Sequence, residues 1–517
     1  MKKIEGFSNR RDLVSRLESV RDKTDSNDLV RVMLDDHEKT LLIYPASVRN
    51  FPRGGVFMAG KFNDRDALFI LGRESLRVMQ EYEGNVIQRQ SDFVIMKCRW
   101  GRAVARRVRE DFPYCTPSNV QSTQTSIAFG DVLGMAGRAQ LLAFRGMADL
   151  AFSRQCIHQL RKLDMHPEDA LDAVTWTIFS EGFEKGFSAE ACHLTTPEDL
   201  KVMLEAGYTR FSIEPFVPPL YSIREKPKKE LIEAIFDIPW IELHDKFELM
   251  FNRYNGNRLD LGPVALSEDG GQHESMVIVP GEAEVLAAIR ILGEIIVQVV
   301  EMERVMVMEG RRDDVILEIS FARTDGSLTP FELFFLVTEL LRRDVQPDFI
   351  APGEITSKHW IVARQTRLMG LSGPVEKLAN LPVATSGLQF HGVVRDISYL
   401  TALECIARKE PALFRKIWTR SRNVLERVKK EEELDLIIQK FPPDKEHEDE
   451  DLPGLLQIEQ ADEFLRHTMS EVFAKKDDQG RRFLRTAVYD FIRKYEQYYT
   501  DALVKRYQDS VGAPSGG

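Results

Sequence analysis

The chain has 517 residues, of which 43% are hydrophobic and 29% charged, as in a globular protein long enough for two or three domains. Its formal net charge of −11 argues against nucleic acid as the main partner, because phosphate binding needs a dominant basic field. The N-terminus lacks the apolar core of a signal peptide, and charges interrupt every apolar run, so we expect a cytoplasmic protein without a membrane span.

The cysteines also suit a reducing compartment. Their number is odd, they are scattered, and no two stand at CxxC spacing, which excludes a disulfide scaffold or a zinc ribbon. They are Cys98, Cys115, Cys156, Cys192 and Cys405. The sequence contains no Walker loop, GxGxxG or HExxH, so no short sequence motif identifies the function.

Residues 1–120 are predicted to form a separate α/β domain. Short apolar runs such as LVRVML, GVFMAG and ALFILG are bounded by Gly, Asp, Asn or Pro, which is typical of strands in a small sheet. The basic segment GRAVARRVRED at 101–111 is predicted to be a helix. Its arginines could form a solvated face or a phosphate-binding surface.

From residue 121 to about 425, short apolar strands alternate with amphipathic helices, which predicts βα units and a parallel sheet. The strands are SIAFGD, DLAFSRQ, the segment containing EACHL, TRFSIEP, VILEISFA, PDFIAP and LQFHG, with an eighth near LANLPVAT. This number favours a TIM-like (β/α)8 barrel over an open sheet. In the third unit we expect Thr196 and Asp199 to form a capping box and Gly207 to end the helix.

The alternation is interrupted at 215–280, which predicts an insertion after the fourth strand. A long helix at 281–309 restores the pattern, and a helical C-terminal region is expected at 426–510. Residues 511–517 are predicted to be a disordered tail. The long helix and the aromatic C-terminal stretch could pack against the barrel or against another subunit of a homo-oligomer.

A barrel of this kind carries its active site at the C-terminal ends of its strands, so polar residues there are the candidates. They are Asp131, Arg154, Gln155, Glu190, Cys192, His193, Glu214, Glu318 and His391. A mixed set of Glu, Cys and His side chains suits a divalent metal such as zinc. Such a metal would polarise a C–O group of a hydroxylated substrate while a carboxylate or an imidazole moved a proton.

Each candidate also has a structural interpretation. Glu318 could pair with an interior Arg or Lys, and Asp131 could cap the helix that follows it. His193 and His391 could be packed or hydrogen-bonded histidines, and Cys192 could be a small buried apolar residue.

Several segments in a shared order resemble the tagaturonate epimerase family over about residues 125–475. They are SIAFGDVLGM, FSRQ, DAVTWTIFSEGFEKGFSAEACHLTTPEDL, ILEISF, FHG with SYL, PALFRKIW, and DEDLPGL with His467 downstream. The resemblance implies a metal-dependent enzyme that inverts C4 of a keto sugar acid, interconverting tagaturonate and fructuronate. The family positions kept here are Asp131, Gln155, Glu190, His193, Glu318, His391 and His467.

The chain departs from the family pattern at several positions. Gln140 stands where the pattern has a histidine, Cys192 where it has an aspartate, and Leu371 where it has a histidine before a Ser-Gly pair. Ala322 and Arg323 stand where the family has acidic residues, and Arg323 could replace a cation by pairing with Glu318.

Two interpretations follow. In the first, the chain is a divergent epimerase or isomerase of a keto sugar or sugar acid, with Asp131 or Glu190 as acid and base. Its zinc, manganese or nickel ion would be held by His193, Glu318, His391 and Cys192, and its substrate by Arg154, Gln155, Arg323 and His467. In the second, it is an inactive relative that binds a sugar or a partner protein. We favour the enzyme, because a buried polar set is costly without compensation.

Overall fold

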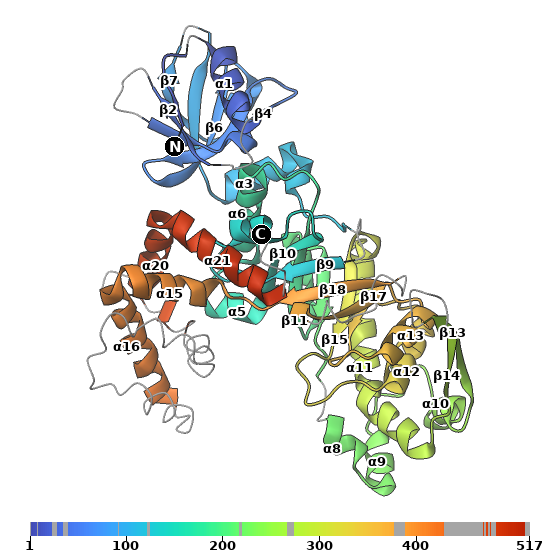
Figure 1. Cartoon of the computed structure of the whole chain (residues 1–517). Coiled ribbons are helices and arrows are strands. Elements are labelled where there is room, and N and C mark those ends of the chain that lie inside the picture. Colours follow the sequence, from blue (N-terminus) through green and yellow to red (C-terminus); the bar gives the residue numbers. More distant parts are fainter. Residues whose placement is uncertain are drawn as a thin grey trace.

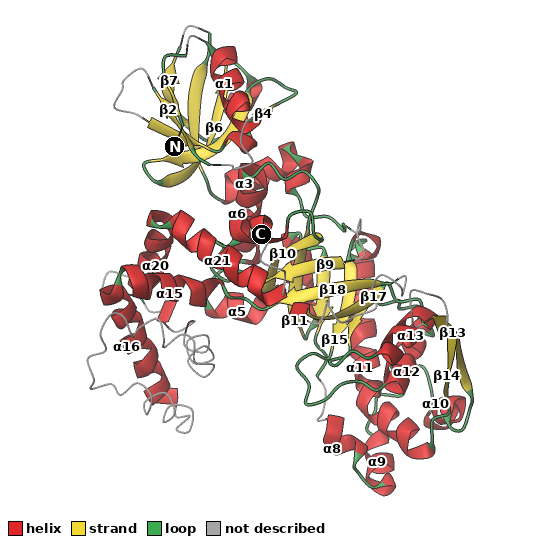
Figure 2. Cartoon of the chain, in the orientation of Figure 1, coloured by secondary structure: helices red, strands yellow, loops and turns green. Residues whose placement is uncertain are grey.

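The computed structural model describes residues 2–511 with gaps at 8, 23–27, 35–39, 91, 121–124, 217–219, 266–272, 377–387 and 429–481; within the last gap only residues 469, 472, 473 and 476 are described. Figure 1 shows an N-terminal domain at the top, a central barrel, helices of the C-terminal region beside the barrel, and further helices at the lower right. Figure 2 shows the same parts by secondary structure, with the strands in yellow.

The N-terminal domain is a twisted sheet of strand order β1-β2-β3-β5-β6-β8-β7, with β4 paired to β5. Its elements are β1 (Lys3–Ile4), α1 (Arg10–Asp22), β2 (Val30–Met33), β3 (Thr40–Ile43), β4 (Arg49–Asn50), β5 (Val56–Phe62), β6 (Arg65–Gly72), α2 (Arg77–Glu81), β7 (Asn85–Arg89), β8 (Val94–Arg99) and α3 (Arg102–Asp111). Asn63 and Asp64 join β5 to β6 at φ values of 52° and 58°. Two residues with positive φ fit a tight hairpin, because such a turn matches the twist of the strands.

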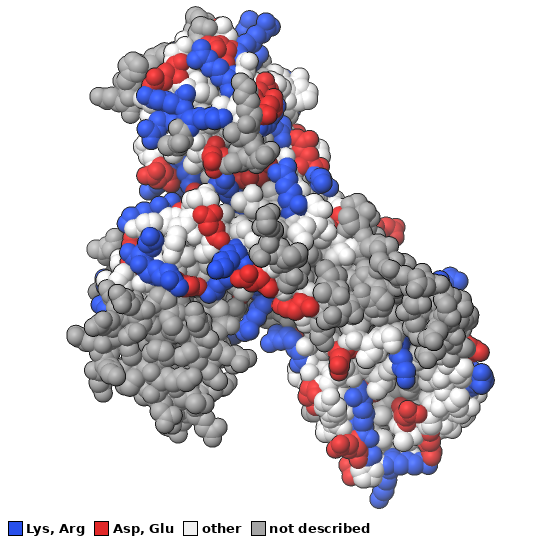
Figure 3. All heavy atoms as spheres, viewed as in Figure 1, with Lys and Arg blue, Asp and Glu red and all other residues white. Residues whose placement is uncertain are grey.

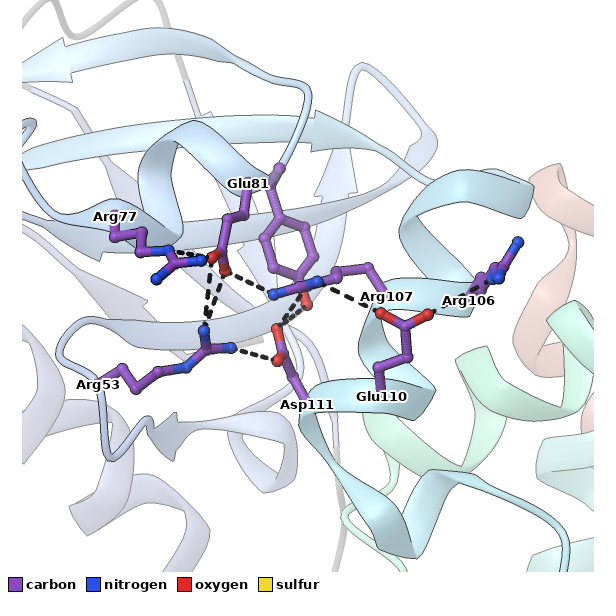
Figure 4. A network of polar contacts seen from close by, with 8 residues as sticks. Arg53, Arg77, Glu81, Arg106, Arg107, Glu110 and Asp111 are labelled. Atoms are coloured by element: carbon purple, nitrogen blue, oxygen red, sulfur yellow. Dashed lines mark hydrogen bonds and ion pairs between the residues drawn. The ribbon is translucent and has the colours of Figure 1, made fainter.

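The basic helix predicted at 101–111 is α3, and its arginines are engaged in ion pairs. Figure 4 shows Arg107 of α3 between Glu81 of α2 and Asp111, while Arg53 reaches the same two carboxylates from the loop before β5. On the other side of α3, Arg109 donates to Asp172 over 2.9 Å. The contact of Arg109 with Asp172 ties the domain to the barrel, and the ion pairs together favour a structural role for the basic face over phosphate binding.

The barrel predicted from the sequence is confirmed as a closed parallel barrel of order β10-β11-β12-β15-β16-β17-β18-β9. Its strands are β9 (Thr125–Phe129), β10 (Asp149–Cys156), β11 (Ser188–Leu194), β12 (Arg210–Ile213), β15 (Ile316–Ser320), β16 (Phe349–Ala351), β17 (Gly370–Pro374) and β18 (Gln389–Val394). Its helices are α4 (Gly137–Phe144), α5 (Ile157–Lys162), α6 (Pro167–Ser180), α7 (Pro197–Ala206), α11 (Glu282–Met308), α12 (Pro330–Leu341), α13 (Ser357–Gln365) and α15 (Ser398–Lys409).

Two local predictions in the barrel have different outcomes. Thr196 caps α7 by accepting a hydrogen bond from the Asp199 amide over 3.2 Å, and Gly207 ends the helix at φ 102°, as predicted. The predicted capping box is incomplete, because the Asp199 carboxylate pairs with Arg161. The strand β17 was not predicted, and the eighth strand expected near LANLPVAT lies outside the described residues. A Cβ atom at Gly370 would lie 1.9 Å from the Gln389 carbonyl oxygen, so the close pairing of the strands requires glycine here. Glycine is unusual within a strand, which made this strand hard to recognise in the sequence.

The interruption at 215–280 contains α8 (Leu220–Arg224), α9 (Lys228–Ile235), α10 (Phe247–Tyr254) and the antiparallel pair β13 (Leu259–Ala265) and β14 (His273–Ile278). The long helix α11 packs against α7, α9 and α12 and buries one face within this chain. This arrangement supports core packing as the use of the helix. The oligomeric state stays a prediction.

The C-terminal region contributes α16 (Pro411–Val428), α20 (Phe483–Lys494) and α21 (Glu496–Val511). Tyr507 of α21 is buried against Phe129 and Phe144 of the barrel wall, with ring centroids 5.8 and 5.9 Å away. The aromatic stretch therefore packs on the barrel. The predicted tail lies outside the described residues, except for Val511 at the end of α21.

Across the described part of the chain, no helix combines the length and the apolar character needed to cross a bilayer. Lys and Arg side chains are interspersed with Asp and Glu over the described surface that Figure 3 presents.

Candidate active site at the mouth of the barrel

The barrel interior is unusually polar, because several strands place charged or hydroxyl side chains at alternate positions. Strand β12 does this with Arg210 and Ser212, which are 1% exposed, and the next alternate residue is Glu214. Side chains alternate between the two faces of a strand, so these residues point to the same side. The polar side chains form two buried networks. A third cluster, at the strand ends, is more exposed than these two.

The first network surrounds Glu318 of β15. Arg210 donates to Glu318 Oε2 over 2.9 Å, Ser212 donates to Oε1 over 2.9 Å, and Ser372 of β17 donates to Oε2 over 2.6 Å. Burial opposes ionisation, but Arg210 outweighs it and lowers the pKa of Glu318. Glu318 therefore forms the interior ion pair that was the structural alternative. Its predicted pairing with Arg323 is wrong, since its cation is Arg210.

The second network surrounds Glu190 of β11. Arg154 donates from Nε to Glu190 Oε1 over 2.7 Å, and His391 Nε2 lies 2.9 Å from Oε2. The other ring nitrogen of His391 is 2.7 Å from the Ser126 hydroxyl. Burial raises the pKa of Glu190, but Arg154 and His391 outweigh it and lower the value to about 2. Such a carboxylate stays ionised at neutral pH and holds Arg154, so it is a weak base.

Asp131 and Gln155 lie apart from these networks. The Asp131 carboxylate accepts a hydrogen bond from the Ala136 amide over 2.7 Å, but Ala136 and not Asp131 is the N-cap residue of α4. Gln155 donates to the Asp131 carbonyl oxygen over 2.8 Å. Burial and the nearby Asp396 raise the pKa of Asp131 to about 7. These two side chains position the loop after β9.

The third cluster lies at the ends of β11 and β12. His193 Nδ1 is 2.9 Å from Glu214 Oε2, and both side chains are about one fifth exposed, at 21% and 19%. Arg323 approaches the same carboxylate oxygen at 3.7 Å from the loop after β15. Burial opposes ionisation of Glu214, but the hydrogen bond with His193 and the charge of Arg323 lower its pKa.

The backbone also marks this cluster. His193 has a φ of 56°, and Ser153, next to Arg154, has a φ of 55°. Left-handed residues other than glycine are uncommon and gather at functional sites. The pairing register shifts beside both residues, which turns Arg154 and His193 relative to a regular strand.

The four predicted metal ligands do not assemble into one site. Glu318 is bound to Arg210, His391 to Glu190, and His193 to Glu214. Cys192 is 2% exposed, and burial raises the pKa of its thiol, so it remains a neutral buried side chain. Among the described residues, no group of three or more His, Cys, Asp or Glu side chains is arranged to hold a metal ion. The donors among the described residues, as arranged, do not fit a metal, and the predicted substrate-binding His467 lies outside these residues.

Sequence reasoning missed Arg210, Ser126, Ser212 and Ser372, which complete the two buried networks. One signal was available for the first of these. The segment RFSIE places polar residues at 210, 212 and 214, which is the period of a strand with a polar inner face. The sequence around Ser126 and Ser372 shows no comparable alternation of polar residues.

Comparison with known proteins gives a consistent result. The model of a family described as tagaturonate epimerase matches residues 44–356 and 383–511. A tagaturonate/fructuronate epimerase of Thermotoga maritima is 25% identical over 433 residues, covering 77% of this chain and 84% of the relative. Two crystal structures of the fructuronate-tagaturonate epimerase of Cohnella laeviribosi, one native and one with glycerol, superpose with TM-scores of 0.74 at 19% and 20% identity. Each covers 91% of this chain and 96% of the other.

Proposed function

Because the chain belongs to the tagaturonate epimerase family, we propose that it is an epimerase that interconverts tagaturonate and fructuronate. The family match spans most of the chain and includes every strand of the barrel except β17, which lies with α13 in the unmatched stretch 357–382. The inactive alternative is not favoured, because the mouth keeps a set of polar groups that are only partly paired with one another.

The observation that carries this proposal is the His193–Glu214 pair at the strand ends. An ionised carboxylate that binds one ring nitrogen of a histidine fixes the tautomer and orients the other nitrogen. With Nδ1 bound to Glu214, Nε2 of His193 is the atom that meets the substrate. A neutral imidazole in this setting can accept a proton and return it.

Arg154 is proposed to bind the substrate carboxylate. Its Nε is held by Glu190, and among the described residues no hydrogen bond occupies its terminal nitrogens, while 17% of its side chain is exposed. Guanidinium groups bind carboxylates through two parallel hydrogen bonds. A sugar acid anchored in this way would place its hydroxylated carbons near His193, because Arg154 is close enough to lower the pKa of Glu214.

The chemistry follows from inverting a carbon whose hydroxyl is β to a ketone. His193 takes the proton of the C4 hydroxyl, the C3–C4 bond breaks, and its electron pair forms an enediolate over C2 and C3. C4 becomes an aldehyde carbon, which rotates to present its other face. The enediolate then attacks it, and His193 returns the proton to the new C4 oxygen. Arg323 brings positive charge to the mouth and would stabilise the enediolate.

The test is to follow tagaturonate and fructuronate by proton NMR with the wild-type chain and with His193→Gln. We expect the wild type to approach the same mixture from either sugar acid, and His193→Gln to lose about 10²–10⁴-fold in kcat, the usual contribution of a proton-transferring group. His158→Gln is the matched control, because His158 is an exposed histidine that lies 3.6 Å from Asp199 on the outer side of the barrel. A wild-type chain that converts neither sugar acid would overturn the proposal.

A further inference from the structure

A cavity of about 320 Å³ lies outside the barrel mouth, where three parts of the chain meet. The sheet of the N-terminal domain contributes Lys61 and Asp66, α6 contributes Trp176, and the C-terminal helices contribute Arg493 and Glu496. Gly134 and Met135 of the loop after β9 line it, but none of the polar side chains Arg154, His193, Glu214 and Arg323 of the mouth does. Its volume lies within the range of about 300–1,000 Å³ that is usual for small-molecule sites.

One wall of the cavity is aromatic. The rings of Trp100 and Trp176 are tilted at a centroid distance of 4.9 Å, and Tyr44 meets Trp176 edge-on at 6.2 Å. The two indoles are only partly buried, so part of their surface faces the space between the domains. The ring planes meet at 59°, so the two partly exposed indoles offer a ligand two apolar faces at an angle to each other.

The remaining lining carries charges of both signs, and most of them are already paired. Glu496 binds Lys61 and accepts a hydrogen bond from the Tyr44 hydroxyl over 3.1 Å. On the opposite side, Arg102 donates to Asp169 over 2.6 Å. A ligand with a net charge of either sign would therefore meet like charge. Paired carboxylates and guanidinium groups suit neutral hydroxyl groups, which both donate and accept.

The carboxylate of Asp66 is the exception. No side chain or amide of the described residues donates a hydrogen bond to it, although it lines the cavity and is partly buried. Burial and the nearby Glu496 raise its pKa, while Lys61 opposes this. Because Asp66 is only partly buried, its carboxylate oxygens can accept a hydrogen bond from a hydroxyl group of a ligand in the cavity.

We propose that this cavity is a second ligand site, separate from the barrel mouth, that binds a neutral monosaccharide. The carbon face of the sugar ring packs on Trp100 and Trp176, and one of its hydroxyl groups donates to Asp66. Because the walls come from the N-terminal domain, the barrel and the C-terminal helices, an occupied site holds these three regions together. Binding therefore stabilises the folded chain as well.

The experiment titrates the full-length chain with galactose by calorimetry, beside galactosamine and galacturonate as cationic and anionic counterparts of the same ring. We expect saturable binding of galactose that is stronger than that of either charged sugar. Asp66→Asn should weaken it about tenfold, since a hydrogen bond to a charged group is stronger than one to a neutral amide. Trp100→Leu should also weaken it by removing one of the two apolar faces, with circular dichroism verifying the fold of both variants.

Two further variants locate the site. Asp64→Asn changes an exposed aspartate in the turn between β5 and β6, so galactose binding should be unchanged. His193→Gln alters the mouth and should leave galactose binding unchanged as well. The proposal is overturned if galactose shows no saturable binding, if a charged sugar binds more tightly, or if His193→Gln abolishes binding while Asp66→Asn does not. None of these outcomes bears on turnover of a sugar acid at the mouth.

Discussion

The interior and the mouth of the barrel use the same kinds of side chain to opposite effect. In the interior, Glu318 and Arg210 are about 1% exposed, and the carboxylate accepts three hydrogen bonds. At the mouth, His193 and Glu214 are about a fifth exposed, and Nδ1 of the imidazole lies 2.9 Å from the carboxylate, which leaves Nε2 for the proposed contact with a substrate. The comparison teaches that a polar residue at a barrel position becomes a candidate for chemistry only where its partners leave hydrogen-bonding capacity unused.

The largest effect on stability is expected from Glu318→Gln. The amide keeps the shape of the side chain but leaves the buried Arg210 guanidinium without a counter-charge, which should cost about 3–5 kcal/mol in the free energy of unfolding. Denaturant unfolding measures this. The double variant Arg210→Met with Glu318→Leu should lose less, because a buried apolar pair needs no counter-charge. Typical substitutions cost about 1 kcal/mol in the free energy of unfolding. If Glu318→Gln costs no more than that, the network is not tightly coupled.

The next effect concerns pH and Glu190. Its pKa in the folded chain is lowered to about 2, whereas an unfolded chain has about 4.3. The carboxylate therefore stabilises the fold fully above about pH 4.3, and this contribution is lost as the pH falls toward 2. Glu190→Gln should be less stable at neutral pH and should show a shallower decline on acidification.

The measurement is the free energy of unfolding of both chains at several pH values from about 6 down to about 3, the interval in which the two pKa values predict the difference. Glu205→Gln is the control, because Glu205 is 61% exposed and lies 3.8 Å from Lys201. Parallel curves for wild type and Glu190→Gln would contradict the assignment of acid sensitivity to this carboxylate.

What the sequence predicted well is local. The caps of α7 and the strand–helix alternation depend on neighbouring residues, so Thr196 and Gly207 could be assigned correctly. Arg210 and Glu318 stand 108 residues apart, and only the closed barrel brings their strands together. The sequence therefore predicted that an interior Arg or Lys could pair with Glu318, but it did not identify Arg210 as that residue.

The same distinction explains the metal prediction. Cys192, His193, Glu318 and His391 were chosen because each lies on a strand of one barrel. In the structure Cys192 is buried, and the other three each bond a partner of their own, which is Glu214 for His193, Arg210 for Glu318 and Glu190 for His391. Sequence position along a strand does not reveal how deep a side chain lies relative to the strands on either side, because the barrel staggers its strands.

A smaller effect is expected for substrate binding by Arg154. Arg154→Lys keeps a positive charge beside Glu190 but loses the two-pronged contact with a carboxylate, so KM for the sugar acid should rise about tenfold, with a smaller change in kcat. Arg161→Lys is the matched control, since Arg161 is 54% exposed and bonds Asp199 on the outside of the barrel. Equal KM values for wild type and Arg154→Lys would show that the substrate carboxylate binds elsewhere.

The smallest effect is expected from removing divalent metal. The described donors pair with one another at the mouth, so affinity for an ion should be weak, because it depends on the number and preorganisation of ligands. Treatment with EDTA should leave turnover unchanged within error, and elemental analysis should find less than one metal ion for each chain. Loss of turnover that zinc, manganese or nickel restores would overturn this expectation. It would mean that an arriving metal ion breaks the His193–Glu214 pair. Paired side chains at the mouth would then be only the metal-free state, whereas the paired side chains of the interior are permanent.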